Sequence, residues 1–321
     1  MQFKEKRTAQ LALFIALLFS ITAGAAPLKE INWVGCGVSK AAFMQDLAAA
    51  YEKKTGIHIN IDGGGATRGI RDVATGKAHL GGSCRLPLIN RNSDGTYSVD
   101  SAEKSVEMIP LGWDALVVIA HPSNPVTKIT EQQLRDVYTG KITNWRELGS
   151  PNDAPINLYA REGKISGVER TMRQLVFDNP DQDFTSRATS LASSGKIEQA
   201  IEKDPNGLGV SGISSSRLRN LKMLSVDDAV PNPENLKKGN YKYYRLLFLV
   251  AAKNYEATPE LRDFVKFATS IEGQHVIEKS GTLPYNHGLR LLNNGLRKSY
   301  LLALDIIEQA GIYAPGGEPL R

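Results

Sequence analysis

The chain has 321 residues, and its 39 Lys and Arg against 34 Asp and Glu give a formal net charge of +5 at pH 7. This length permits one large domain or two medium ones, and an apolar fraction of 41% is ordinary for a folded globular protein. The mild charge, and the lack of a basic run interleaved with aromatic residues, argue against a nucleic-acid partner.

The N-terminus has the pattern of an export signal. Basic residues at the start precede an apolar run at 11–21, and small residues follow at 23–25. The run is too short to span a bilayer comfortably, and small residues at this place are typical of a cleavage site. We therefore expect residues 1–25 to be a signal peptide and the mature protein to be periplasmic, with an uncleaved anchor as the alternative.

Beyond the signal, β-like runs alternate with helical patterns, which predicts an α/β fold with a mostly parallel sheet. Residues 91–100 are polar and rich in turn formers, so a surface loop is expected there. The helical patterns cover 41–54, 67–78, 130–138, 167–177, 194–203, 261–270 and 273–280.

Two long apolar strands are expected at about 113–120 and 243–251. They flank a central block of the chain, which suggests a second lobe inserted into the first and joined to it by these strands. Such an arrangement is a two-lobed clamp, with a ligand in the cleft and a hinge where the strands cross.

The sequence predicts three segments. They are a signal peptide at 1–25, a binding domain at 26–290 with lobe 1 at about 28–112 and 252–290 and lobe 2 at about 121–242, and a C-terminal amphipathic helix and tail at 291–321. Apolar residues from Leu292 to Ile307 recur at near-helical spacing in the last segment. Gly295 weakens the prediction for its first turn.

Three β-like runs end in glycine-rich loops that open into helices. The loops are 35–39 (GCGVS), 62–67 (DGGGAT) and 162–167 (EGKISG), and each contains a hydroxyl residue placed to be a helix N-cap: Ser39, Thr67 and Ser166. A helix start carries free backbone N–H groups and a partial positive charge, and glycine lets an anion approach them. Three such loops with arginines nearby predict a site for a small tetrahedral anion.

In their order along residues 30–285, these motifs resemble those of the phosphate-binding (PstS-like) proteins of ABC importers, a branch of the type 2 periplasmic binding fold. Residues 81–85 (GGSCR) are similar to the family's G-A-S-S-R strand end, and 138–145 (YTGKITNW) to its F-x-G-x-I-x-x-W pattern. Residues 161–167 (REGKISG) resemble its R-E-x-G-S-G-T loop, with one extra residue and Val168 in place of threonine.

The resemblance implies a ligand set at the three helix starts, with two arginines: Gly37, Val38, Ser39, Ala66, Thr67, Arg85, Arg161, Ser166 and Gly167. Arg161 would supply the charged fork, because a guanidinium can hold a tetrahedral oxyanion with two hydrogen bonds. A site selective for hydrogen phosphate also needs a carboxylate acceptor, for which Asp62 and Asp114 are the candidates. Phosphate is the favoured ligand, and sulfate, molybdate and tungstate remain open.

The function implied is that of an exported binding protein that captures phosphate for an ABC importer. Its partners would be the permease and ATPase subunits in the inner membrane, and it would act as a monomer without cofactor or metal. No Walker loop, G-x-S-x-G elbow or convincing pair of carboxylates indicates an enzyme. A phosphate-sensing or surface module, or a phosphatase or esterase on the same fold, are the alternatives.

Several polar residues also have structural interpretations. Asp114 could be a structural hydrogen-bonding residue of its strand, and Arg85 could form an ion pair within one lobe. Arg170 and Arg173 are expected on a solvated helix face. Cys36 and Cys84 follow the first and third strands, which are neighbours in the type 2 fold, so a disulfide between them is expected in an exported protein.

Overall fold

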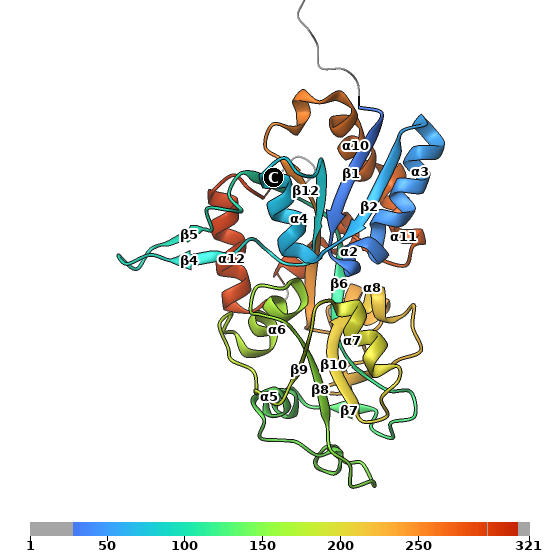
Figure 1. The fold of residues 1–321 in the computed structure, drawn as a ribbon, viewed down its shortest axis with the longest axis vertical. Coiled ribbons are helices and arrows are strands. Elements are labelled where there is room, and N and C mark those ends of the chain that lie inside the picture. Colours follow the sequence, from blue (N-terminus) through green and yellow to red (C-terminus); the bar gives the residue numbers. More distant parts are fainter. Residues whose placement is uncertain (1–27, 294, 314–321) are drawn as a thin grey trace, which may run out of the picture.

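The computed structural model describes residues 28–293 and 295–313, so the predicted signal peptide lies outside the described residues. The two-lobed α/β fold predicted from the sequence is confirmed (Figure 1). In the main sheet the strand order is β2-β1-β3-β12-β6-β10-β8-β9. No helix in the described part of the chain is long and apolar enough to cross a membrane.

Strands β6 (Val106–Ala120) and β12 (Tyr244–Ala252) join the two lobes. They pair antiparallel from Val106 to Ala115, and β6 then continues beside β10 from Leu116 to Ala120. Both strands are almost completely buried, which explains their continuous apolar sequences. The two expected crossing strands are confirmed, and each is part of a strand with bounds close to the apolar runs of the sequence.

Lobe 1 is built on a sheet in which β1 pairs parallel with β2 and β3, and β3 pairs antiparallel with β12. Its elements are β1 (Glu30–Gly35), α2 (Gly37–Ser39), η1 (Lys40–Met44), α3 (Gln45–Thr55), β2 (His58–Gly63), α4 (Gly65–Ala74), β3 (Leu80–Ser83), η3 (Tyr255–Ala257), α10 (Pro259–Thr269), α11 (Ile271–Lys279), β13 (Leu283–Pro284) and η4 (Tyr285–Asn293).

Lobe 2 is built on β8, which pairs parallel with β9 and β10, while β10 and β11 pair antiparallel with β6. Its elements are β7 (Lys128–Ile129), α5 (Glu131–Thr139), η2 (Trp145–Leu148), β8 (Asn157–Arg161), α6 (Gly167–Phe177), β9 (Thr189–Leu191), α7 (Ser194–Ile201), β10 (Gly207–Gly212), α8 (Ile213–Ser216), β11 (Lys222–Val226) and α9 (Pro233–Lys238).

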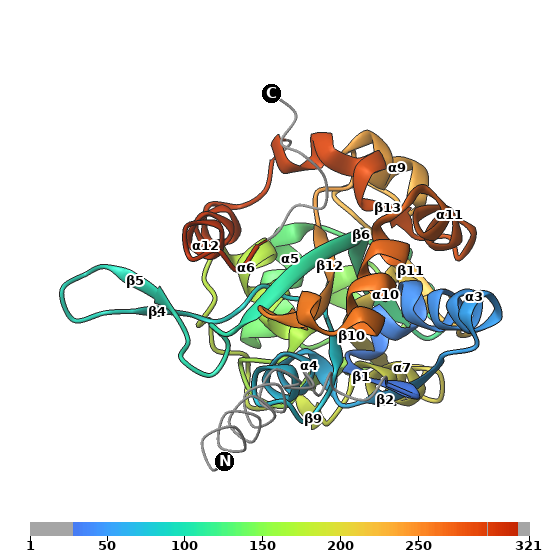
Figure 2. The same ribbon diagram turned by 90° about the horizontal axis from the view of Figure 1, so that it is seen from above.

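Two segments differ from the sequence prediction. The expected surface loop at 91–100 forms part of a hairpin of β4 (Ile89–Arg91) and β5 (Tyr97–Val99), which projects from the body of the molecule in Figures 1 and 2. The C-terminal helix α12 (Lys298–Gln309) is present, but it begins only after Gly295, which has a φ of +91°.

Helix α4 lies unusually close to the lobe 1 sheet at Gly69. A Cβ on Gly69 would lie 2.8 Å from the carbonyl oxygens of both Val34 and Gly82, which belong to β1 and β3. Backbone atoms of a sheet cannot move aside as a flexible side chain could. This glycine therefore fixes the distance between the sheet and the helix whose N-terminus faces the interlobe region.

We expect Gly69→Ala to reduce the free energy of unfolding by about 1–3 kcal/mol, because the added methyl group overpacks the contact between α4 and the sheet. Gly63→Ala is the matched control, since a Cβ there meets nothing within 4 Å and its φ is not positive. Urea denaturation of both variants measures the difference. Equal stability of the two variants would contradict this account of the packing.

Candidate functional site

The first glycine loop forms a helix start, but its capping residue differs from the prediction. Cys36 occupies the N-cap after β1, and the helix runs without a break from α2 through η1 into α3. The Ser39 backbone N–H donates to Cys36 Sγ at 3.3 Å, and the two side chains lie 3.1 Å apart. The Ser39 N–H, expected to face an anion, is therefore held by Cys36. The N–H groups of Gly37 and Val38 remain in the first turn, where a helix offers no internal acceptor.

The second loop also begins its helix earlier than predicted. Gly64, with a φ of +151°, is the N-cap of α4, and Thr67 lies within the first turn. A positive φ is easy only for glycine, which is why the chain can turn here without a hydroxyl cap. Thr67 Oγ1 donates instead to the carbonyl oxygen of Ile165 at 2.8 Å, so this side chain crosses to lobe 2.

The third loop starts α6 as the sequence predicts, with Ser166 at the N-cap. The Ser166 side chain makes no capping hydrogen bond, and its Oγ is buried without a hydrogen-bond partner among the described residues. A buried hydroxyl without a partner costs free energy, so an acceptor or donor outside the chain is expected to complete it.

The three helix starts meet at the waist of the molecule (Figure 1). A Cβ on Gly167 would lie 2.4 Å from Cys84 Sγ and 3.1 Å from the Cβ of Ala66, so lobe 2 touches lobe 1 directly there. The Cys84 and Cys36 side chains are close enough to shift each other's pKa, so the start of α2 lies at the same place. Partial positive charges of three helix starts are thus concentrated in one region.

Arg161, at the end of β8, lies beside this cluster. Its backbone N–H donates to Glu169 Oε1 at 3.0 Å, and its NH1 group donates to the Leu191 carbonyl at 3.0 Å. Its NH2 group would be 3.7 Å from a Cβ on Gly65, beside the start of α4. Burial lowers the pKa of Arg161, while nearby Cys84 and Glu169 act in the opposite direction. The guanidinium makes no other hydrogen bond to the described residues.

Glu169 was not identified from the sequence, although it supports the position of Arg161. It is completely buried in the first turn of α6, and burial raises the pKa of its carboxyl to about 7, against the effect of the Arg161 N–H and of Arg173. A glutamate three residues after an N-cap serine is a recognisable signal of a capping box. Here the Glu169 carboxylate accepts instead from the backbone N–H of Arg161, at the end of β8.

Arg85 does not have the role that the resemblance implied. All its N–H donors are used within the protein. NH1 and NH2 donate to the two oxygens of Glu103 at 2.8 and 2.7 Å. NH1 also donates to the Leu86 carbonyl, NH2 to Thr67 Oγ1, and Nε to the Ile165 carbonyl at 2.9 Å. The ion-pair alternative is therefore the observed one. Arg85 contributes a hydrogen bond between the lobes and has no donor left for an anion.

Both candidate carboxylates already have partners within the protein. Asp62 is exposed and pairs with Arg68 at 2.8 Å. Asp114 is fully buried, where its Oδ1 accepts from the N–H and hydroxyl of Ser214 and its Oδ2 accepts from Arg245. The structural interpretation of Asp114 is the one observed.

Arg245 is the site residue that the sequence analysis missed. It lies in β12, is completely buried, and donates to Asp114 from Nε at 3.2 Å and from NH2 at 2.9 Å, while NH1 has no hydrogen-bond partner among the described residues. Cys36 and Cys84 are close enough to raise its pKa, although burial alone would lower it. The sequence did contain a sign of this pair, because one acidic residue, Asp114, and one basic residue, Arg245, interrupt the two long apolar strands.

Arg170 and Arg173 are not on a solvated face, so that expectation is wrong. Every residue of α6 from Gly167 to Val176 is buried. Arg170 donates to the Pro180 carbonyl and to Asp181, and Arg173 donates to the Gln182 carbonyl and stacks 3.7 Å above the ring of Phe184. Both side chains anchor the loop that follows the helix.

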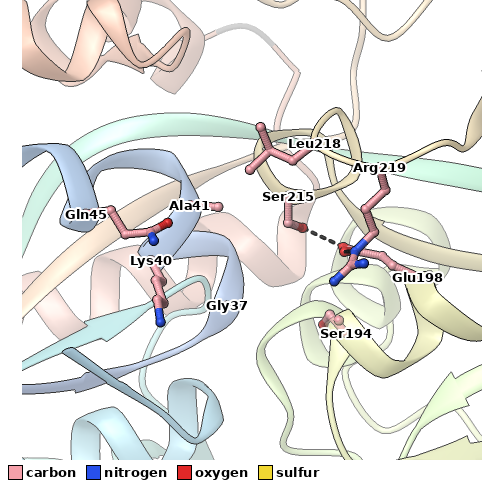
Figure 3. A pocket seen from close by; sticks show the side chains of 10 residues that line it. Gly37, Lys40, Ala41, Gln45, Ser194, Glu198, Ser215, Leu218 and Arg219 are labelled. Carbon is pink, nitrogen blue, oxygen red and sulfur yellow. Dashed lines mark hydrogen bonds and ion pairs between the residues drawn. The ribbon is translucent and has the colours of Figure 1, made fainter.

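A cavity of about 290 Å3 lies between the lobes beside the first helix start. Figure 3 shows Lys40, Ala41 and Gln45 of lobe 1 facing a wall of lobe 2 residues. On the lobe 2 side, the buried Glu198 accepts hydrogen bonds from Ser215 Oγ at 2.6 Å and from Arg219 Nε at 2.7 Å. Gly37 lines the cavity, so the start of α2 borders an opening between the lobes.

The two cysteines lie together as expected, but the structure contains them as free thiols rather than as a disulfide. Within residues 28–293 and 295–313, no group of three or more His, Cys, Asp and Glu side chains is arranged to hold a metal ion.

Comparisons with known proteins identify the family of the chain. The model of the PBP superfamily domain matches residues 26–272. The phosphate-binding protein PstS of Borreliella burgdorferi is 28% identical over 191 residues, which cover 57% of this chain and 68% of that protein. PstS of Bacillus subtilis is 24% identical over 253 residues, 77% of this chain and 79% of the relative.

Solved structures show the same likeness. A provisionally assigned phosphate ABC transporter substrate-binding protein from Clostridium perfringens, solved with bound phosphate, is 27% identical with a TM-score of 0.68, over 79% of this chain and 99% of that one. A phosphate transport receptor from Vibrio cholerae has a TM-score of 0.57 at 24% identity, over 79% and 99% of the two chains, which supports the fold. The chain therefore belongs to the PBP superfamily, and within it is similar to the PstS-like phosphate-binding proteins.

Proposed function

We propose that this protein binds inorganic phosphate between its lobes and delivers it to an ABC importer. The observation that carries the proposal is the convergence of three helix starts on two arginines that retain unpaired donors, Arg161 and Arg245. The relatives named PstS and the phosphate-bound structure from Clostridium perfringens support the same ligand. A binding role, rather than an enzymatic one, accords with these relatives.

The proposed ligand set differs in part from the one implied by the resemblance. Backbone N–H groups of Gly37, Val38 and Ala66, the Ser166 hydroxyl and the Gly167 N–H belong to the helix starts. Arg161 and Arg245 supply positive charge, and Arg245 takes the place that Arg85 cannot fill. Ser39 and Thr67 act mainly within the protein, by holding Cys36 and the Ile165 carbonyl.

Sulfate is the second candidate ligand, for a specific reason. Hydrogen phosphate carries a proton that needs an acceptor, whereas sulfate does not. Asp62 is exposed and paired with Arg68, and both oxygens of Asp114 already accept hydrogen bonds. The affinities of the purified protein for phosphate and for sulfate are therefore the first quantities to compare.

The proposed setting is the periplasm, reached through the signal at residues 1–25. The partners would be the permease and ATPase subunits of the importer, with the binding protein acting as a monomer. These assignments rest on the N-terminal sequence and on the transporter relatives.

We expect phosphate to raise the melting temperature of the mature protein. At about 100 times its dissociation constant, a ligand that binds only the folded state adds about 2.7 kcal/mol of stability. Thermal unfolding and calorimetry with phosphate, sulfate, molybdate and tungstate, against chloride at equal ionic strength, measure the effect. A response to sulfate alone would reassign the ligand, and no response to any oxyanion would exclude the binding role.

Arg161→Ala is expected to weaken phosphate binding by about 2–5 kcal/mol, because it removes charge-assisted hydrogen bonds from a desolvated site. Arg187→Ala is the control, since Arg187 is an exposed arginine of the same lobe. Arg173 is unsuitable as a control because it is buried and packs on Phe184. Calorimetric titration of both variants tests this, and equal affinities would show that Arg161 is outside the site.

Arg245→Lys should keep the buried charge beside Asp114 but lose the unpaired NH1 donor. We expect phosphate binding to weaken by about 1.5–3 kcal/mol, the range for a hydrogen bond to a charged group. Arg262→Lys, at a half-buried arginine of lobe 1 that pairs with Asp263 at 3.2 Å, is the control. Chemical denaturation of each variant separates a loss of affinity from a loss of fold. Unchanged affinity in a folded Arg245→Lys variant would remove Arg245 from the ligand set.

A further inference from the structure

We propose that Cys36 and Cys84 form a redox pair beneath the anion site, and that their oxidation to an intramolecular disulfide stiffens the site while closure of the lobes shields the pair. The formation of the disulfide is independent of the proposed function. Its effect on ligand affinity rests on that function.

The first support is the position of the two residues in the sheet. Cys36 directly follows β1 and Cys84 directly follows β3, and these parallel strands pair Gly35 with Gly82. The Cys36 N–H donates to the Gly82 carbonyl at 3.2 Å, so the pairing extends to the first cysteine itself. Neighbouring strands are roughly 5 Å apart, and disulfides form at Cα separations of about 4.4–6.8 Å. Continued by one residue, this register places Cys36 beside Ser83 and next to Cys84, and each thiol shifts the pKa of the other.

The second support is the electrostatic asymmetry of the pair. Burial raises the pKa of the Cys36 thiol, but hydrogen bonds from Cys84 and Ser39, together with the charge of Arg245, outweigh it and lower the pKa. The hydrogen bond to Cys36 and burial raise the pKa of Cys84, as does Asp114, against Arg245. The charges of both thiols also act on the pKa of Arg161 in lobe 2, which they raise. Cys36 therefore loses its proton more readily than Cys84, and thiol–disulfide exchange begins with attack by a thiolate.

The third support is the cover over the pair. Cys36 and Cys84 are 5% and 1% exposed. Lobe 2 provides part of this cover, because Gly167 contacts Cys84 Sγ and Thr171 Oγ1 donates to the Cys84 carbonyl at 3.2 Å. A soluble reagent can therefore reach Cys84 more easily when the lobes separate. An anion that holds the lobes together should protect both thiols.

The oxidant in this proposal is a soluble disulfide such as oxidised glutathione. The Cys36 thiolate attacks one sulfur of that disulfide, forms a mixed disulfide and releases one glutathione thiolate, which takes up a proton. Cys84 loses its proton and attacks Cys36 Sγ, which forms the intramolecular bond and releases the second glutathione. Two protein thiols are oxidised, and one glutathione disulfide is reduced to two thiols.

Oxidation has two consequences for the anion. It removes the negative charge that a Cys36 thiolate would place beside the ligand. It also ties the loop after β1 to the loop after β3, so less conformational freedom is lost when they order around the anion. Both effects favour tighter binding by the oxidised protein.

The covalent step is tested on the mature protein without phosphate. After equilibration with oxidised glutathione, alkylation under denaturing conditions and intact-mass measurement should show no label, whereas the reduced protein should take two. Cys36→Ser and Cys84→Ser variants are the controls, because neither can form the bridge and the remaining thiol should still be labelled or carry one glutathione. Two labels on the oxidised wild type would overturn the disulfide.

The link to the ligand is tested separately. Phosphate affinity measured by calorimetry should be about two- to tenfold higher for the oxidised than for the reduced protein, and alkylation of the reduced protein should slow when phosphate replaces chloride at equal ionic strength. The Cys36→Ser/Cys84→Ser double variant should bind equally with and without reductant. Equal affinities of the oxidised and reduced wild type would overturn the coupling while leaving the disulfide intact. If no oxyanion binds either form, the proposed function fails instead.

Discussion

The buried ion pair between Asp114 and Arg245 holds together the parts of the molecule that make the site. It joins β6 to β12 at the junction of the lobes, and Asp114 also accepts the N–H and hydroxyl of Ser214 at the start of α8. Burying two charges is expensive unless their hydrogen bonds are completed. Here the carboxylate is completed by four donors, whereas the guanidinium keeps one donor, NH1, unpaired among the described residues.

Gly212 shows how tightly this junction is packed. A Cβ there would lie 2.5 Å from Asp114 Oδ2, 2.9 Å from Arg245 NH2 and 2.7 Å from Val38 Cγ1. The ion pair and Val38 in the first turn of α2 therefore border the same small space beside Gly212. The buried charges of the crossing strands can therefore act at the start of α2, where the anion is proposed to bind, because only a space the size of a methyl group separates them.

The sequence predicted the three loops but not how their polar groups are used. Glycine-rich loops after apolar runs are local features, so the starts of α2, α4 and α6 could be located without a structure. The caps at Cys36 and Gly64 could not, because a thiol rarely caps a helix and Gly64 acts through a φ of +151°. Which arginine keeps a free donor depends on tertiary partners. Glu103 engages Arg85, whereas Arg245 has only Asp114.

The C-terminal helix α12 adds a constraint on lobe motion, beyond the matched domain at residues 26–272. Arg297, at its N-cap, donates to both oxygens of Glu131 in lobe 2 at 2.7 Å, whereas the Tyr300 hydroxyl accepts from the Leu246 N–H in β12 at 3.1 Å. The helix therefore contacts α5 of lobe 2 and the strand that carries Arg245, and Arg297 Nε also donates to the Leu175 carbonyl in α6 at 3.1 Å. Opening of the cleft has to preserve these contacts or break a buried hydrogen bond. A hinge at the crossing strands therefore has α12 on one side, and on the side of α8 the lobes are joined by Arg217, which donates to the carbonyls of Ser280 and Gly281 in lobe 1.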